Sequence, residues 1–272
     1  MTTTHRLQRS GRRRSVAGFT LTELLTVLAI LVLLVGLLLT ALNRAHQRAD
    51  SATCMNGTRQ VVLAWVMYSH DANRLVPNVD GLLGGLTNWV AGNMTSAEER
   101  TNTALLIDGR RSLLATYLSD PRVFKCPAEE SDNSRSISLN SRLNPVRYNG
   151  VSARWVGGLG RAFKTFRAIS DIDNPSSTFV TIEENPLIND AYFAVDLSNT
   201  GSPDGEGTSQ PYWLIDYPAN NHASSANVSF ADGHVESHRW QESDTTTRLT
   251  PITRFPDSSR DARWVQEHCS NR

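Results

Sequence analysis

The fold of this chain is decided by an uncharged stretch near its N-terminus, residues 24–42, which reads LLTVLAILVLLVGLLLTAL. At about 1.5 Å per residue, a helix over these nineteen residues spans roughly the 30 Å hydrocarbon core of a bilayer. A buried helix of a soluble domain is one competing interpretation, but such a helix normally keeps a polar face, and this stretch has none. A secretory signal peptide is another, yet its apolar part is usually about 7 to 15 residues long. We therefore predict one membrane-spanning helix.

The charges that flank this stretch predict its orientation. Five arginines precede it with no acidic residue among them, and these are Arg6, Arg9, Arg12, Arg13 and Arg14. Basic flanks stay on the cytoplasmic side, so we expect a cytoplasmic N-terminus and an exported chain after about Arg44. The prediction is a single-pass inner-membrane protein with a periplasmic C-terminal domain.

The composition excludes several classes of protein. The chain has 27 basic and 27 acidic residues, and without residues 1–18 its formal charge becomes −5. A generally basic nucleic-acid binder is therefore excluded, and we expect no nucleic-acid partner. The three cysteines form no CxxC pair, which argues against a disulfide-built scaffold and against a zinc or redox motif of that kind.

Residues 18–25, at the head of the apolar stretch, read Gly-Phe-Thr-Leu-Thr-Glu-Leu-Leu. With the Arg-rich leader and the apolar helix, they resemble the processing site of type IV prepilins and of the pseudopilins of type II secretion. The resemblance implies that a prepilin peptidase cuts between Gly18 and Phe19 and methylates the new N-terminal Phe19. It also implies that Glu23 serves assembly with other pilin-like subunits through the N-terminal helix. The chain departs from many pilins in having only Gly36, and no proline, near the middle of this helix.

The helix is predicted to continue beyond the membrane. Apolar residues recur at three- and four-residue steps, at Ala45, Ala49, Ala52, Met55, Val62 and Trp65 or Val66. Gly57 is a weak point and Pro77 forbids continuation, so we expect the helix to end within residues 69–73. Its apolar stripe needs a sheet to cover it. We therefore predict an α+β fold in which a long N-terminal helix packs on an antiparallel β-sheet, as the resemblance to type IV pilins also implies.

The predicted organisation has four parts: a leader (1–18), the membrane-spanning half of the helix (19–42), its exported half (43–75) and a β-rich globular domain (76–272). Alternating patterns in the last part predict strands at 178–183, 191–197 and 212–215. We also expect a short strand at 88–90, a helical turn at 111–118, an extended segment at 123–127 and irregular chain at 128–150.

A hairpin is predicted around Asp232-Gly233, because these two residues tolerate the positive φ angles of a two-residue type I′ turn. With His222 they form a His-x9-Asp-Gly motif, which resembles the C-terminal motif of pilin-like proteins of planctomycetes and verrucomicrobia. Cys54-x-Asn56, Arg59-Gln60 and Cys126-Pro127 resemble further parts of that pattern. We expect His222 to hydrogen bond so that its loop is held against the turn.

The cysteines leave several pairings open. Cys54 and Cys126 would both lie in an oxidising compartment, and the sheet must fold back on the helix that carries Cys54, so a Cys54–Cys126 disulfide is one prediction. Free thiols and a Cys126–Cys269 bond are the alternatives.

No metal site and no cofactor is expected. His234 and His238 share a strand face but would lie about 13 Å apart, too far to chelate one ion. Residues 196–206 (DLSNTGSPDGE) offer oxygen ligands for calcium but lack the spacing of an EF-hand, so we expect a solvated turn, with calcium as the alternative. Glu183 and Glu184 point to opposite faces of a strand and are expected at a rim.

The sequence predicts a structural role. Motifs for nucleophilic catalysis or phosphate binding are missing, so an enzyme is not expected. The leading prediction is a pilin-like subunit that assembles into a type II secretion or type IV pilus-like filament. The alternative is a membrane-anchored binding module for a carbohydrate or surface polymer, displayed from about Val76 onward.

Overall fold

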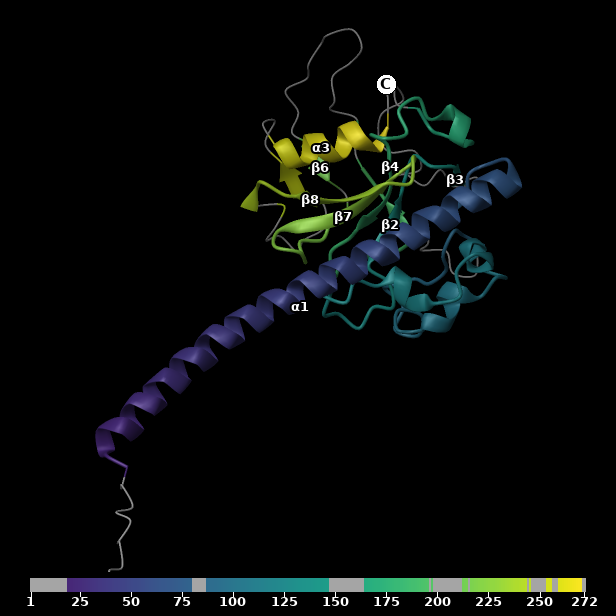
Figure 1. Ribbon diagram of the computed structural model, residues 1–272. Helices are drawn as coiled ribbons and strands as arrows, with labels where there is room; N and C mark the ends of the chain where they lie inside the picture. The colour runs from purple at the N-terminus through teal and green to yellow at the C-terminus, as the bar shows by residue number, and fades with distance from the viewer. Residues whose placement is uncertain are drawn as a thin grey trace, which may run out of the picture. The chain divides into compact units, whose positions relative to one another are not determined.

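The computed structural model describes residues 19–79, 87–146, 164–195, 197, 212–214, 216–243, 245, 253–255 and 259–270, with backbone alone at 212–214 and 253–255. The chain divides into two units, Met1–His46 and Gln47–Arg272, and helix α1 (Leu21–Ala72) runs through the boundary. The described part of the first unit is the beginning of α1. The second unit holds the rest of α1, the strands and helix α3 (Arg260–Cys269), as Figure 1 shows.

Helix α1 begins with a capping box. The backbone N–H and the hydroxyl of Thr20 both donate to Glu23 Oε2, at 2.9 and 2.8 Å, and the N–H of Glu23 donates to the Thr20 hydroxyl oxygen at 3.3 Å. All side chains of residues 24–42 are exposed, and the hydroxyls of Thr26 and Thr40 donate to backbone carbonyl oxygens three residues back. Within the described residues, α1 is the one helix long and apolar enough to cross a membrane. This helix fits a membrane anchor or a signal sequence.

In the second unit, α1 buries one face against the domain. The buried residues are spaced by three and four, and they are Cys54, Gly57, Thr58, Val61, Val62, Ala64, Trp65 and Ser69. The predicted start of the stripe is wrong, because Ala45, Ala49 and Ala52 are exposed and the first buried residue of the helix is Cys54. The helix ends at Ala72, where Asn73 takes a φ of 52°, so the predicted end within residues 69–73 is confirmed.

A five-stranded sheet forms the centre of the second unit, in the order β5-β2-β4-β7-β8. Its strands are β2 (Ile137–Asn140), β4 (Phe179–Glu183), β5 (Tyr192–Phe193), β7 (Ser225–Phe230) and β8 (Val235–Arg239). The predicted α+β class, a long helix packed on a mainly antiparallel sheet, is confirmed. The sheet is nevertheless mixed, because β2 and β5 pair in parallel. Strand β2 lies inside the sheet, so the prediction of irregular chain over 128–150 is wrong there.

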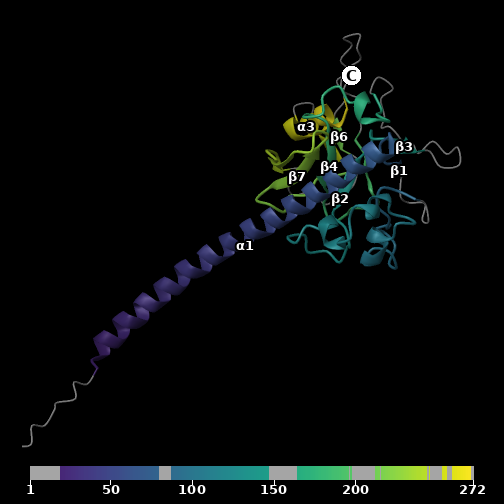
Figure 2. The ribbon, with the colours of Figure 1, turned by 45° about the vertical axis from the view of Figure 1, so that its right-hand side comes forward.

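Shorter elements surround this sheet. β1 (Asn78–Val79) pairs with β3 (Pro145–Val146) near the end of α1 in Figure 2, and β6 (Tyr212–Leu214) pairs with β9 (Thr253–Phe255). The 3-10 helices are η1 (Thr103–Ile107), η2 (Leu113–Thr116), η3 (Pro121–Phe124) and η4 (Ile169–Asp171). The predicted helical turn at 111–118 thus forms as η2. Of the segment expected to be extended at 123–127, the first two residues belong to η3, and Lys125 after it is extended. The strand expected at 88–90 is reduced to one bridge between Asn88 and Ser112.

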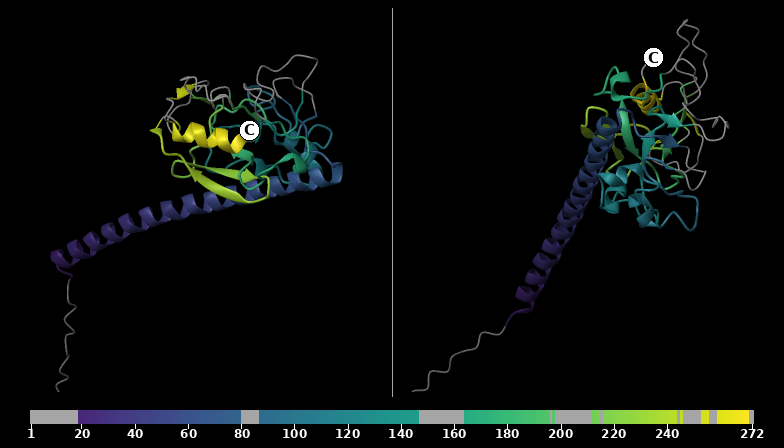
Figure 3. Two further views of the ribbon diagram at one scale, coloured as in Figure 1. Left: turned by 90° about the horizontal axis from the view of Figure 1, so that it is seen from above. Right: turned by 90° about the vertical axis from the view of Figure 1, so that its right-hand side faces the viewer.

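The two faces of the sheet carry separate cores. On one face, Ile137, Leu139 and Val180 join Val61 and Trp65 of α1. On the other, β4 and β7 pack against α3, through Phe179, Val228, Phe230, Ala262, Val265 and Cys269. In the left view of Figure 3, the β7–β8 hairpin lies between α3 and the later part of α1. Because α1 covers one face of the sheet and α3 the other, successive residues along a central strand contact different helices.

The turn of the β7–β8 hairpin differs from the predicted two-residue type I′ turn. The Gly233 N–H donates to the Phe230 carbonyl at 2.9 Å, and the Phe230 N–H donates to the His234 carbonyl at 3.0 Å, so residues 231–233 form a three-residue loop. Gly233 has a φ of +92°, whereas Asp232 is not among the residues with positive φ. A type I turn followed by a left-handed glycine meets the same twist requirement.

Candidate metal centre

Four potential metal ligands from distant parts of the chain meet on the α1 face of the sheet. Cys54 comes from α1, Cys126 follows η3, Glu183 ends β4, and His222 precedes β7. We call these four residues the donor cluster. Local contacts fix their positions. The Cys126 N–H donates to the Ser136 hydroxyl oxygen at 2.8 Å, and the His222 N–H donates to the Ser225 carbonyl at 3.3 Å.

The ligand atoms of the donor cluster all lie within 4.8 Å of one another. The Cys126 sulfur is 3.3 Å from His222 Nε2, which is 3.5 Å from Glu183 Oε1, and the Cys54 thiol donates to the same Glu183 oxygen. In a tetrahedral zinc site with bonds of about 2.0 to 2.3 Å, neighbouring ligand atoms are about 3.3 to 3.8 Å apart. The separations of His222 Nε2 from the Cys126 sulfur and from Glu183 Oε1 fall in that range, and the four donors lie close enough together to surround one ion.

The second oxygen of Glu183 is held by the neighbouring strand. Glu183 Oε2 accepts the backbone N–H of Asn227 at 2.6 Å, and Oε1 receives a longer contact from the Asn227 side-chain amide at 3.5 Å. This arrangement leaves Oε1 directed at the other three donors. An outer hydrogen bond of this kind orients a ligating carboxylate.

The donor cluster is closed to solvent. Cys126 and Glu183 are 0% exposed, and Cys54 and the His222 side chain are 5% exposed. The pKa of the Cys126 thiol is lowered, chiefly by hydrogen bonding with Cys54. Burial raises this pKa, but a hydrogen bond with His222 lowers it further. Burial lowers the pKa of His222, but hydrogen bonds with Cys126 and Glu183 outweigh it and raise that pKa. The hydrogen bond with Cys126, burial and the Glu183 charge raise the pKa of Cys54.

This geometry admits two kinds of chemistry. A thiolate beside an imidazole is a nucleophile pair, but the burial of the Cys126 sulfur leaves a substrate no approach. Two sulfurs, one imidazole nitrogen and one carboxylate oxygen are also ligands that zinc binds. That no metal is bound stays a prediction from the sequence.

The structure brings Cys54, Cys126 and His222 together. Cys54 and Cys126 are neighbours, as the disulfide prediction requires, and both are free thiols in this structure, so the disulfide stays a prediction. Cys269 is buried away from them and bonds with Asn140, which rules out the Cys126–Cys269 alternative in this structure. His222 does not hold its loop against the turn, because β7 separates it from Asp232, which instead accepts from His234 Nδ1 at 2.6 Å.

Glu183 is the residue that sequence reasoning missed. The pair Glu183 and Glu184 was expected at a rim, yet both are buried, at 0% and 2% exposure. They do point to opposite faces. Glu183 faces Cys54, while Glu184 accepts from the Ser138 hydroxyl at 2.5 Å and lies near the buried Arg135 guanidinium. No local pattern marks Glu183, because its partners come from three other elements.

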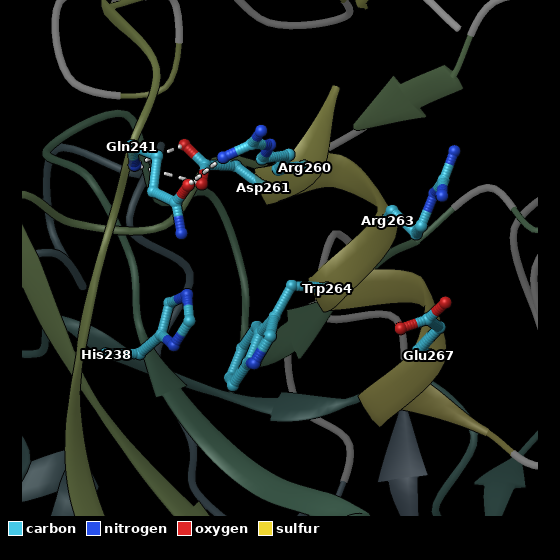
Figure 4. A pocket seen from close by; sticks show the side chains of 7 residues that line it. All are labelled: His238, Gln241, Arg260, Asp261, Arg263, Trp264 and Glu267. Carbon is cyan, nitrogen blue, oxygen red and sulfur yellow. Dashed lines mark hydrogen bonds between the residues drawn. The ribbon is translucent and has the colours of Figure 1, made fainter. Parts of the chain in front are cut away.

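A shallow pocket of about 420 Å³ lies against α3, apart from the donor cluster (Figure 4). It is lined by His238, Gln241, Arg260, Asp261, Arg263, Trp264 and Glu267. Both carboxylate oxygens of Asp261 accept the Gln241 N–H at 3.0 Å, and the Trp264 ring stacks with His238 and His268 at 3.7 and 4.2 Å between centroids. These contacts fasten α3 to the end of β8.

The remaining predicted sites lie in or near the first unit or outside the described residues. Phe19 is 74% exposed, and Glu23 sits in the capping box of α1. Gly18, the leader and nearly all of the calcium-type loop 196–206 fall outside the described residues. The cleavage site and the calcium alternative therefore stay predictions.

Comparisons of the chain with protein-family models, with curated proteins and with solved structures find no match. The functional interpretation therefore depends on the motifs and the geometry of the chain itself.

Proposed function

We propose that this protein is a pilin-like subunit, processed by a prepilin peptidase and assembled through α1 into a type II secretion or type IV pilus-like filament in the cell envelope. The observation that carries this proposal is the motif of residues 18–25 at the head of a helix that exposes apolar side chains over residues 24–42. An apolar helix whose side chains stay exposed among the described residues fits a role in lipid and then against neighbouring helices.

Glu23 is the proposed assembly residue. In the uncut chain its carboxylate accepts from Thr20, and this capping box satisfies N–H groups at the start of α1. Cleavage after Gly18 would create a charged amine on Phe19 that lacks a partner in an apolar filament core. Pairing that amine with Glu23 of a neighbouring subunit would satisfy both charges and fix the axial stagger of the helices.

Intact-mass analysis of protein from its native membrane tests the proposal. We expect loss of residues 1–18 and one added methyl group, and we expect Gly18→Val to abolish both changes. Gly11→Val is the matched control, because it alters another glycine of the leader away from the proposed cleavage site. A mature protein that keeps the leader, or starts at another residue, contradicts the proposal.

The alternative function, a displayed binding module, can be distinguished from a filament subunit by exchanging the anchor. Replacing residues 1–42 with an unrelated single span should leave a module's ligand binding intact, whereas a filament subunit should lose assembly. The pocket beside α3 would be the place for a ligand, but stacking with His238 and His268 already engages the Trp264 ring. We therefore favour the filament subunit.

A further inference from the structure

We propose that the donor cluster binds one Zn²⁺ ion as a closed structural site. The proposal goes beyond the filament function and does not depend on it, because all four ligands belong to the second unit of the chain. Two thiolates, one imidazole and one carboxylate within 4.8 Å of one another form a borderline-soft set of ligands, which suits zinc better than the oxygen-seeking ions calcium and magnesium.

Burial and charge favour an ion in this position. Ligation requires both thiols and Glu183 ionised and His222 neutral, so the four donors would carry three negative charges, and the cation would replace the proton that the Cys54 thiol donates to Glu183. A divalent ion reduces the net charge of the site to −1. The other carboxylate oxygen, Glu183 Oε2, already accepts a hydrogen bond from the Asn227 N–H at 2.6 Å. The site thus has both an inner shell and an outer hydrogen bond that fixes it.

The site would be structural rather than catalytic. A catalytic zinc ion has three protein ligands and a fourth position open to water or substrate. Here four protein donors surround the position: Cys54, Cys126 and Glu183 are buried, and the side chain of His222 is 5% exposed. The ion would link α1, the segment after η3, β4 and the segment before β7. Its effect would be to lock α1 onto the sheet.

The metal content of the full-length protein tests this inference. The chain is purified from membranes in mild detergent with a thiol reductant and without chelator, and its metals are counted by mass spectrometry. We expect one zinc ion per chain. Replacement of zinc by Co²⁺ should give the intense visible absorption of tetrahedral thiolate coordination, together with a sulfur-to-cobalt charge-transfer band.

Single substitutions identify the ligands. Cys126→Ser, Glu183→Gln and His222→Gln should each reduce the zinc content of the chain well below one. Cys269→Ser and His238→Gln are matched controls that remove a buried thiol and a half-buried imidazole outside the cluster, and they should keep one zinc per chain. If a ligand variant does not fold, the cobalt spectrum of the wild-type chain decides.

Three results would overturn the proposal. The first is a Cys54–Cys126 disulfide in non-reducing peptide maps of the native protein. The second is a reduced, folded chain that takes up neither zinc nor cobalt. The third is stoichiometric zinc that survives in the ligand variants, which would place the ion elsewhere.

Discussion

Replacing Gly57 with alanine is expected to destabilise the globular domain, although alanine is the better helix former. A Cβ built on Gly57 would lie 2.9 Å from the backbone carbonyl oxygen of Val123. Since that atom belongs to the backbone of η3, the helix and η3 would have to move apart. Helix propensity alone favours alanine by about 1 kcal/mol. Overpacking costs about 1 to 3 kcal/mol, and a clash with a backbone atom, which cannot rotate away, belongs in the upper part of that range, about 2 to 3 kcal/mol. Subtracting the gain in helix propensity leaves an expected net loss of about 1 to 2 kcal/mol in the free energy of unfolding.

Thermal unfolding followed by tryptophan fluorescence measures this loss, because all six tryptophans lie in the second unit. A domain of this size loses about 2 to 4 °C of Tm per kcal/mol, so the Tm should fall by about 2 to 8 °C. Gly36→Ala is the matched control in the same helix, because a Cβ there meets nothing within 4 Å, and its Tm should not fall. An unchanged or raised Tm for Gly57→Ala would refute the argument that Gly57 permits close packing.

Two further substitutions test other parts of the chain. Glu23→Gln removes the charge but keeps the capping box, which glutamine also forms. Cleavage should therefore persist, while cross-linking between subunits through a cysteine introduced at Val32 should fall. Equal cross-linking yields in the variant and the wild type would exclude a charge-dependent contact. Gly233→Ala should reduce the free energy of unfolding by about 1 to 2 kcal/mol, because alanine resists a φ of +92°. Gly109→Ala, which also meets nothing within 4 Å and has no positive φ, should change it little, and equal effects of both would disprove a conformational cause.

The sequence was sufficient to predict those elements whose pattern is long or contains characteristic turn residues. The length of α1 follows from an unbroken apolar run and then a buried stripe, and β4 and the hairpin follow from alternation and from Asp232-Gly233. Short elements escaped prediction. Strand β2 has only four residues, and its buried Ser138 and Asn140 look like loop residues in the sequence.

Helix α3 was also missed, although its signals are present. Ser259 caps it by accepting the Ala262 N–H at 3.1 Å, and Ala262, Val265 and Cys269 form a buried stripe at three- and four-residue spacing. The donor cluster is a different case. Its residues are separated by long stretches of chain, so their convergence depends on the register of β4 against β7 and on the packing of α1, which no local spacing encodes.

The spacing of the His-x9-Asp-Gly motif follows from the strand inside it. His222, which lies three residues before β7, belongs to the donor cluster, and Gly233 after the end of β7 closes the hairpin with β8. Between them, Asn227 faces Glu183 while Val228 packs in the core beside α3. Because side chains alternate along a strand, a shift of one residue would put Val228 against the buried Glu183 carboxylate and Asn227 into the apolar core. The fixed distance between the histidine and the turn therefore preserves the face on which the cluster forms, and this physical requirement applies whether or not an ion is bound.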